Sequence, residues 1–351
     1  MDIQVTSVSK EPEKLLDAAA AIQVVTNDEI ARSGATSLPE ALRLADNLEV
    51  AQENSHDWAI SARGFDANLA NKLLVLIDGR AVYSPLYGGV EWNVEDYLLA
   101  DIDRIEVVSG PGGTLWGANA VNGVINVTTK SARDTQGLLV EQGVGSELED
   151  YTAVRYGGTL GTGVNFRVYA EYADRGSEVF SDGSDASDSA RTTRAGFRVD
   201  TNPSTDSAIT LQGDYYSGEE GLGSLGDAGL SGWNVLGRWT RTLADGSELS
   251  FQAYYDRTHL SQPFAPSPAN PPYYTGFPLA SLLDDLDTYD AELQYSVKVG
   301  ARNSVVCGVG YRFTHELDED ISIVRFQPPS LDQNLFSGFA QDEIALRNDL
   351  T

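Results

Sequence analysis

The feature that most constrains this chain is an alternation of apolar and polar residues with a period of two, which begins after Gly137. The clearest stretches cover residues 164–172, 209–216, 249–256 and 291–299. Successive side chains of a β-strand point to opposite faces, so this pattern predicts strands with one face in an apolar medium and the other in a polar one. We count about ten such strands up to the last residue.

The segments between these strands differ in length. Residues 244–246 form a short turn, whereas residues 174–189, 218–230 and 262–275 read as long polar loops. Short turns at one end and long loops at the other are typical of an outer-membrane β-barrel, in which Tyr and Trp near the strand ends form interfacial girdles. A soluble β-sandwich is the alternative that the pattern alone leaves open.

The residues before Ser131 have a different pattern, in which short strands accompany helical signals. Strands are predicted at residues 22–25, 73–77, 105–108 and 124–127. Thr26 and Glu29 have the spacing of a capping box for a helix that ends at Gly34. Ser37 is placed to cap a second helix with Pro39 in its first turn. These signals predict a small domain of mixed helices and strands.

Composition excludes several classes of function. The formal net charge is −28, with 24 Lys and Arg against 52 Asp and Glu, so the chain lacks the basic footprint of a protein that binds nucleic acid. The single cysteine, Cys307, cannot form an internal disulfide or a cysteine-rich metal site. His56, His259 and His315 lie too far apart in sequence to form a metal motif. The chain contains no hydrolase, metalloprotease or nucleotide-binding motif, which argues against an enzyme.

The two ends of the sequence suggest part of a longer product. Met1 is followed by neither the basic nor the apolar region of a signal peptide, so we expect a mature form or a piece of a longer gene. No apolar run is long enough to predict a membrane-spanning helix. An open sheet of about ten strands would leave two unpaired edges, so we expect the barrel to be truncated at its C-terminus.

The most specific sequence is RIEVVSGPGGTLWGANAVNGVINV at residues 104–127. Two shorter motifs precede it, ARGF at residues 62–65 and LVLIDGRAVY at residues 74–83. In this order and spacing they resemble the plug domain of TonB-dependent outer-membrane receptors, closely over residues 15–132 and by pattern beyond. Ser109 stands where the family usually has Arg, Asn122 where Gly is common and Ala62 where Ile is usual. The plug is therefore expected to be held differently at Ser109.

The resemblance implies an α+β plug domain followed by an antiparallel transmembrane β-barrel, which has about 22 strands in the full-length family. It divides the chain into a TonB box and linker at residues 1–13, the plug at residues 14–133 and the first part of the barrel at residues 134–351. The motif residues expected to build the plug, and not to contact ligand, are Arg63, Gly64, Asp78, Gly79, Glu106, Gly110, Pro111, Gly117, Gly123 and Asn126.

Local chemistry supports a structural role for these motif residues. Asp78-Gly79 is a hairpin turn signal, and residues 110–113 predict a tight turn where positive φ is tolerated. Gly117 and Gly123 suit a close backbone approach inside a crowded lumen. The charged side chains expected to face a polar barrel wall are Arg63, Arg104 and Glu106.

The family also carries an N-terminal TonB box, a short extended segment. The residues at the corresponding distance before the plug are Ile3, Gln4, Val5, Thr6 and Ser7. They precede residues 10–13, which are expected to form a flexible linker. The resemblance implies that the box pairs edge to edge with TonB, which acts together with ExbB and ExbD. A disordered leader is the alternative for this segment.

Ligand contacts are expected from plug loops at the extracellular apex, which correspond to residues 53–57, 66–71 and 83–88. The side chains predicted to contact ligand are His56, Asn68, Tyr83 and Tyr87. Asp182, Asp185 and Asp188, in a loop rich in Gly and Ser, are either a calcium site or a solvated loop. No resident metal or cofactor is expected, although the ligand itself is expected to be a metal chelate.

The predicted function is TonB-dependent active transport of a scarce ligand across the outer membrane of a Gram-negative bacterium, with membrane lipid around the barrel. A ferric siderophore is the first candidate, and cobalamin, haem and an oligosaccharide remain open, as does a non-functional truncated receptor. The acidic balance disfavours a strongly anionic siderophore. A passive porin would lack the plug and the box, and a signalling receptor would carry a further domain before the box.

Overall fold

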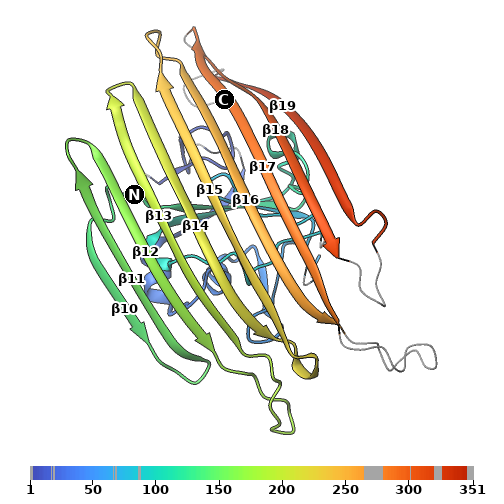
Figure 1. Cartoon of the computed structure of the whole chain (residues 1–351). Coiled ribbons are helices and arrows are strands. Elements are labelled where there is room, and N and C mark those ends of the chain that lie inside the picture. Colours follow the sequence, from blue (N-terminus) through green and yellow to red (C-terminus); the bar gives the residue numbers. More distant parts are fainter. Residues whose placement is uncertain are drawn as a thin grey trace.

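The computed structural model describes residues 3–16, 18, 20–65, 67, 69–85, 88–264, 280–300, 302–319 and 326–345. These residues form an N-terminal domain and an antiparallel sheet of ten strands. In Figure 1 the ten strands stand side by side as a curved wall, and the N-terminal domain lies behind it. Within the described residues, no helix has the length and apolar character needed to cross a membrane.

The N-terminal domain is built on a five-stranded sheet with the order β3-β8-β9-β6-β7. Its strands are β3 (Ala21–Thr26), β6 (Leu73–Ile77), β7 (Arg80–Ala81), β8 (Ile102–Ser109) and β9 (Gly123–Thr129). β6 and β9 are parallel, and the other neighbouring strands are antiparallel. All the strands predicted for this domain are present, and β8 begins earlier than its apolar run indicated.

Shorter elements surround this sheet. They are β1 (Gln4–Val5) with β2 (Glu13–Lys14), β4 (Glu49–Gln52) with β5 (Trp58–Ser61), the helices α1 (Asn27–Ser33), α2 (Leu38–Ala41) and α3 (Gly113–Trp116), and the 3₁₀ turns η1 (Leu42–Leu44) and η2 (Leu99–Asp101). The capping box of Thr26 and Glu29 is present, and Gly34 ends α1 with a φ of 82°. The predicted second helix is one turn of α-helix continued by η1, whereas β4, β5 and α3 were not predicted.

The core of the domain lies between its sheet and these helices. Leu38, Leu42 and Ile105 are fully buried, and every residue of β6 is buried. Burying one such side chain stabilises a fold by about 1.5–3 kcal/mol. The spacing of Leu38 and Leu42 places both on the face of the helical segment that packs against the sheet.

The predicted glycine turns have different physical causes. Asp78 and Gly79 have φ of 50° and 85°, as a two-residue type I′ hairpin requires. A Cβ atom on Gly123 would lie 2.5 Å from the carbonyl oxygen of Val108, so close backbone approach is confirmed there. The same prediction is wrong for Gly117, which has open space around it. Gly117 is instead suited to its φ of 75°.

The ten strands of the large sheet follow one another in sequence order, with β10 and β19 at its open edges. They are β10 (Gly137–Gly143), β11 (Leu148–Leu160), β12 (Val164–Arg175), β13 (Ala190–Ser204), β14 (Ser207–Gly221), β15 (Asp227–Thr242), β16 (Glu248–Phe264), β17 (Ala280–Val299), β18 (Asn303–Glu319) and β19 (Ser330–Ile344). The 3₁₀ turn η3 (Gly223–Leu225) connects β14 to β15. The strand count and the antiparallel order agree with the prediction.

Two of the segments predicted as long loops contain strand residues. Residues 218–230 are mostly strand, because β14 and β15 remain paired from Gly218–Leu230 to Gly221–Asp227. The prediction failed there because small Gly and Ser residues hide the alternation. In the other loop, β16 extends to Phe264, and the predicted residues 265–275 lie outside the described part.

The two faces of the large sheet differ in polarity. Val168, Leu211 and Leu293 point away from the N-terminal domain and are 47%, 44% and 41% exposed. Arg167 and Glu171, on the opposite face of β12, are buried against that domain. This is the arrangement that the period-two pattern predicts, with the apolar face outward.

An aromatic row crosses the outer face of the sheet. Ring centroids are 4.6 Å apart for Trp233 and Tyr255, 4.8 Å for Tyr255 and Tyr289, and 6.1 Å for Tyr289 and Phe313. The row lies near the middle of the strands and not at their ends, where girdles were expected. On one side of the row the outer face becomes charged, where Arg257 binds Asp285 and Asp287 at 3.0 Å each. The strands therefore continue well past the apolar band.

Candidate functional site

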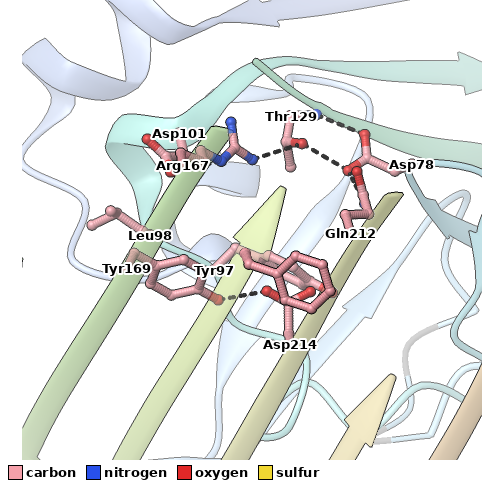
Figure 2. Close-up of a pocket in the computed structure, with 10 residues that line it drawn as sticks. Asp78, Tyr97, Leu98, Asp101, Thr129, Arg167, Tyr169, Gln212 and Asp214 are labelled. Atoms are coloured by element: carbon pink, nitrogen blue, oxygen red, sulfur yellow. Dashed lines mark hydrogen bonds and ion pairs between the residues drawn. The ribbon is translucent and has the colours of Figure 1, made fainter. Parts of the chain in front are cut away.

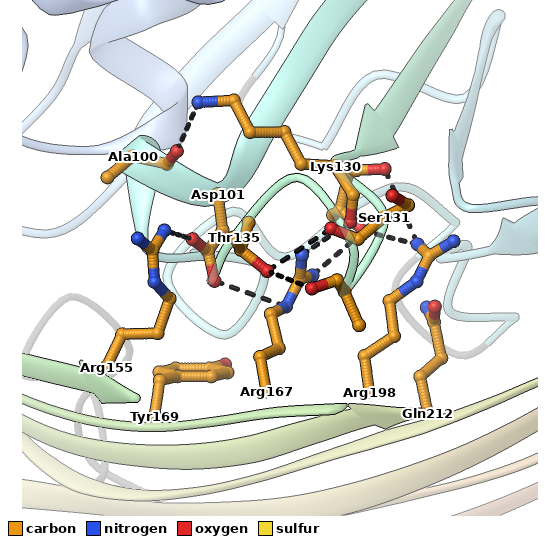
Figure 3. Close-up of polar contacts among 12 residues, drawn as sticks. Ala100, Asp101, Lys130, Ser131, Thr135, Arg155, Arg167, Tyr169, Arg198 and Gln212 are labelled. Atoms are coloured by element: carbon orange, nitrogen blue, oxygen red, sulfur yellow. Dashed lines mark hydrogen bonds and ion pairs between the residues drawn. The ribbon is translucent and has the colours of Figure 1, made fainter. Parts of the chain in front are cut away.

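A first polar contact between the two parts forms around Asp101, the last residue of η2 and only 4% exposed. Arg155 of β11 donates to its Oδ1, and the Nε atom of Arg167, on β12, lies 3.2 Å from its Oδ2. Arg167 also donates to the hydroxyl of Thr129 at 3.1 Å. Figure 3 shows the arginines rising from the sheet toward the N-terminal domain. A buried carboxylate and cations of the sheet thus compensate one another.

A second contact forms at the β6–β7 turn. Asp78 accepts hydrogen bonds from the backbone N–H and hydroxyl of Thr129, at 2.9 and 2.7 Å, and from Gln212 of β14 at 2.8 Å. Arg238 of β15 donates to the carbonyl of Asp78 at 2.5 Å. Burial opposes ionisation of Asp78, but Arg198 and these hydrogen bonds hold its pKa below the ordinary value. This motif aspartate therefore forms the turn and also fastens it to the sheet.

Figure 2 shows a small cavity beside this turn. Its wall includes Leu98 from the N-terminal domain and Tyr169 and Asp214 from the sheet. The Tyr169 hydroxyl donates to Asp214 at 2.8 Å. Because its polar walls already bind one another, this cavity belongs to the contact between the two parts.

Arg80 makes a third contact directly after the same turn. Its guanidinium donates to Glu95 at 2.9 Å and to the hydroxyl of Tyr97 at 2.8 Å, and it forms an ion pair with Asp256 of β16. Arg80 is 4% exposed. The sequence did not identify this cluster, because nothing in a single sequence pairs residue 80 with residue 256. The available signal was a cation within the mostly apolar motif of residues 74–83.

His56 forms a fourth contact, which differs from its predicted role. Its Nε2 lies 3.2 Å from the carbonyl of Gly221 in β14, and its Nδ1 lies 3.4 Å from Asp57 and 3.5 Å from Glu220. Burial disfavours the imidazolium, but the Asp57 hydrogen bond and the Glu220 charge outweigh it and raise the pKa of His56 to about 9. His56 is 5% exposed and holds the loop against the sheet, and it also lines a small cavity with Trp58 and Arg194, so its predicted ligand contact stays a prediction.

A cavity of about 30 Å³ lies at another part of the contact between domain and sheet. Its lining includes Tyr83 and Glu91 from the N-terminal domain and Thr258 and Asp284 from β16 and β17. Burial and the charge of Asp284 raise the pKa of Glu91 to about 8. Tyr83 lines this cavity, and its predicted contact with ligand stays a prediction.

The N-terminal segment is docked against the domain through Glu106. This carboxylate accepts hydrogen bonds from the backbone N–H of Thr6 at 3.0 Å, the N–H of Ser7 at 2.9 Å and the Ser7 hydroxyl at 2.6 Å. Trp116 donates to the carbonyl of Ser7 at 2.7 Å. Glu106 has no exposed surface. The expectation that it faces the barrel wall is wrong, because it is occupied by the segment predicted as the TonB box and by Arg104.

The predicted linker at residues 10–13 is also different from expected. It leads into β2, which pairs with β1, so residues 10–13 belong to a hairpin, where a flexible linker was predicted. Lys10 forms an ion pair with Glu292 of β17 at 3.0 Å, and Ser304 of β18 donates to Glu11 at 3.3 Å. These contacts place the hairpin beside the short β17–β18 turn.

The remaining residues that were singled out from the sequence do not lie together in one site. Asn68 and Tyr87 lie outside the described residues. Arg63 is exposed and has a φ of 62°, and Ser109 accepts a hydrogen bond from Asn47 at 2.6 Å within the domain. The aspartates of the proposed calcium loop do not converge: Asp182 accepts from Ser184 and Asp185 from Ser187. Across the described ranges, no group of three His, Cys, Asp or Glu is arranged to hold a metal ion.

Comparison with known proteins agrees with this architecture. Residues 14–124 match the family described as the TonB-dependent Receptor Plug Domain. The chain is 33% identical to the vitamin B12 transporter BtuB of Vibrio vulnificus over 150 residues, which are 42% of this chain and 24% of that protein. It is 31% identical to BtuB of Vibrio cholerae over 144 residues, which are 40% of this chain and 23% of that protein. The matched region thus spans about a quarter of these relatives.

Solved receptor structures share the fold. The ferripyoverdine receptor of the Pseudomonas aeruginosa outer membrane superposes with a TM-score of 0.76 at 17% identity, covering 99% of this chain and 52% of the receptor. A mutant of the ferric enterobactin receptor PfeA from the same organism gives a TM-score of 0.72 at 15% identity, covering 94% of this chain and 56% of the receptor. Residues 14–124 are therefore a plug domain of the TonB-dependent receptor type, and the chain as a whole shares the arrangement of plug and strands with these receptors.

Proposed function

We propose that the receptor containing this chain imports a scarce ligand across the outer membrane of a Gram-negative bacterium. The observation that carries this proposal is the asymmetry of the large sheet. Its inner face binds the plug through buried charges such as Arg167, whereas its outer face exposes apolar side chains such as Leu211 and an aromatic row. An apolar outer band bounded by aromatic residues is what a barrel wall in a bilayer requires.

The two ends of the plug have different contacts, which supports a direction of transport. The N-terminal hairpin lies beside the short β17–β18 turn through Glu11 and Ser304, the second residue of β18. The cavity with Tyr83 lies farther along the same strands, beside Asp284. Because short turns face the periplasm in such barrels, we assign the hairpin to the periplasmic end and the cavity to the extracellular side.

The proposed mechanism links these two ends. A ligand enters from the extracellular side and contacts the plug at the cavity. Its binding favours a state in which residues 3–7 leave Glu106 and become available to TonB, which acts with ExbB and ExbD. β1 is an extended segment that pairs only with β2 among the described strands, so its other edge suits strand addition by TonB. No covalent chemistry is needed.

A ferric siderophore is the first ligand that we propose. Cobalamin is the second candidate, and the observation in its favour is the 33% identity to a vitamin B12 transporter over the plug region. Haem and oligosaccharides remain alternatives within the same mechanism. A non-functional truncated receptor is the alternative outside it, and the growth test below separates this from the others.

The test is growth of a receptor-deficient strain that expresses the full-length gene. Ferric siderophores serve as sole iron source in one series, and cobalamin is the required nutrient in another. Growth on a ligand should be lost when residues 3–7 are deleted, although the receptor remains at the cell surface. Surface-exposed receptor that supports growth on none of these ligands would contradict both the siderophore and the cobalamin proposal, and growth that survives the deletion would contradict TonB-dependent import through residues 3–7.

A further inference from the structure

Carboxylates gather on the sheet wall beside the extracellular cavity. Asp284 of β17 lines the cavity and lies directly opposite Asp318 of β18 in the strand register. Directly opposed residues have Cβ atoms about 4.5–5.5 Å apart, so these two aspartates are neighbours on the same face. Glu316 lies two residues along β18 and points to the same side. Glu91 of the plug lines the same cavity.

Burial makes this arrangement costly unless a cation enters it. Asp284 is 3% exposed and Asp318 is 6% exposed. The Oδ1 atom of each is buried and has no hydrogen-bond partner among the residues that the structure describes. A buried carboxylate without a partner is destabilising, and like charges directly opposite one another add to that cost.

The cation that lines the same cavity does not compensate these charges. Arg80 also lines the cavity, but its guanidinium is already bound by Glu95, Tyr97 and Asp256. The pKa of Glu91 is raised to about 8 by its burial and by the charges of Asp284, Glu220, Glu95 and Asp57. Glu91 is therefore largely protonated at neutral pH, and the groups that can make this part of the cavity negative are Asp284 and Asp318.

The geometry favours a large cation over a bare metal ion. No group of three acidic or His side chains within the described ranges converges closely enough to hold an ion. Carboxylates spread along a cavity wall suit a positive charge carried on a larger molecule, such as an ammonium group or a cationic metal complex. The enclosed space is about 30 Å³, which is roughly the size of one water molecule, so it can admit the cationic tip of a ligand but not the whole ligand.

We propose that Asp284 and Asp318 bind the positively charged part of the transported ligand, and that this ligand is a metal complex with a net positive charge. The inference rests on the proposed function, since it takes the cavity to be the entry site. Among ferric siderophores and cobalamins, the inference therefore favours the compounds that carry a net positive charge. It also predicts rejection of anionic siderophores, because the carboxylates repel them.

Two matched ligand pairs test this proposal on the purified full-length receptor by calorimetry at neutral pH. One pair is a ferric trihydroxamate chelate with a free pendant amine and the same chelate with that amine acetylated. The other is aquacobalamin, which is cationic, and neutral cyanocobalamin. In at least one pair the cationic member should bind at least tenfold more tightly. The double variant Asp284→Asn, Asp318→Asn should abolish that preference while retaining the affinity for the neutral member.

The matched control is Asp285→Asn, the adjacent residue on the outer face of β17, which should keep the preference. Equal binding within both pairs, tighter binding of the neutral members, or a preference that survives in the double variant would overturn the inference. So would failure of a folded receptor to bind either cationic compound. None of these results would affect the proposed function, which is judged separately by box-dependent growth.

Discussion

Buried charges are paired with opposite charges in the middle of the plug–sheet contact, and they are unpaired at the end that we assign to the extracellular side. In the middle, Asp101 meets two arginines and Arg80 meets two carboxylates. At the extracellular end, Asp284 and Asp318 face one another with no cation among the described residues. The paired charges fix the position of the plug. The unpaired carboxylates can gain a favourable interaction when a cationic ligand binds, as strained or unsatisfied groups at functional sites do.

The largest expected effect is loss of the Arg80 cation. Arg80→Met should lower the free energy of plug unfolding by about 3–5 kcal/mol, because Glu95 and Asp256 remain buried without their partner. Urea titration of the full-length receptor in detergent measures this change. The control is Arg32→Met, whose ion pair with Asp28 is exposed and should contribute less than about 1 kcal/mol. Similar losses in the two variants would show that the interior pair does not hold the plug.

The next effect is a pH dependence carried by His56. Its pKa is raised to about 9, so its stabilising contribution is complete below pH 6.5 and is lost as pH rises through 9. The total is on the order of 3 kcal/mol. His56→Gln should flatten the decline of plug stability over this pH window, measured by hydrogen exchange of plug amides. An unchanged pH profile would contradict the contact that we assign to this ring.

A smaller effect is expected at the periplasmic end. Glu106→Gln should weaken the charge-assisted hydrogen bonds to Thr6 and Ser7 by about 1–2 kcal/mol in total, which raises the released fraction of the box roughly tenfold. A spin label on Gln4→Cys, in a Cys307→Ser background, reports this fraction. Glu49→Gln is the control, since Glu49 is exposed and accepts from Gly64. Equal label mobility in both variants would show that Glu106 does not dock the box.

The smallest effect is expected at Asp284, and it tests most directly whether the middle and the end of the plug–sheet contact differ. Asp284→Asn should leave plug stability unchanged or raise it by up to about 1 kcal/mol, because it removes one of two opposed buried charges. The same urea titration measures it, with Asp285→Asn as the control on the outer face. A loss above about 1 kcal/mol would mean that Asp284 has a stabilising partner, and that the extracellular end resembles the middle.

Local features of the fold could be predicted from the sequence because their causes are local. The capping box at Thr26, the Asp78-Gly79 turn and the alternation in β12 each depend on neighbouring residues. The failures have local causes too. Gly and Ser conceal the strand pairing of residues 218–230, and β4 and β5 are too short to show a period.

The site was less predictable, because it is made by residues far apart in the chain. Arg80 meets Asp256, and Glu106 meets Ser7, across separations that no periodicity reports. The motif indicated that Glu106 matters but not what it binds. His56 was predicted from its loop position as a ligand contact, and its burial depends on the opposing β14. Tyr83 was predicted on the same grounds, and it does line a cavity.

The most direct test of the account separates ligand binding from ligand uptake in the same cells. Radiolabelled ligand identified by the growth assay is measured both bound at the surface and accumulated inside, for wild-type receptor and for a receptor without residues 3–7. We predict normal surface binding and no accumulation for the deletion, because the cavity and the docked box occupy opposite ends of the plug. Accumulation that persists without residues 3–7, or binding that disappears with them, would contradict the account.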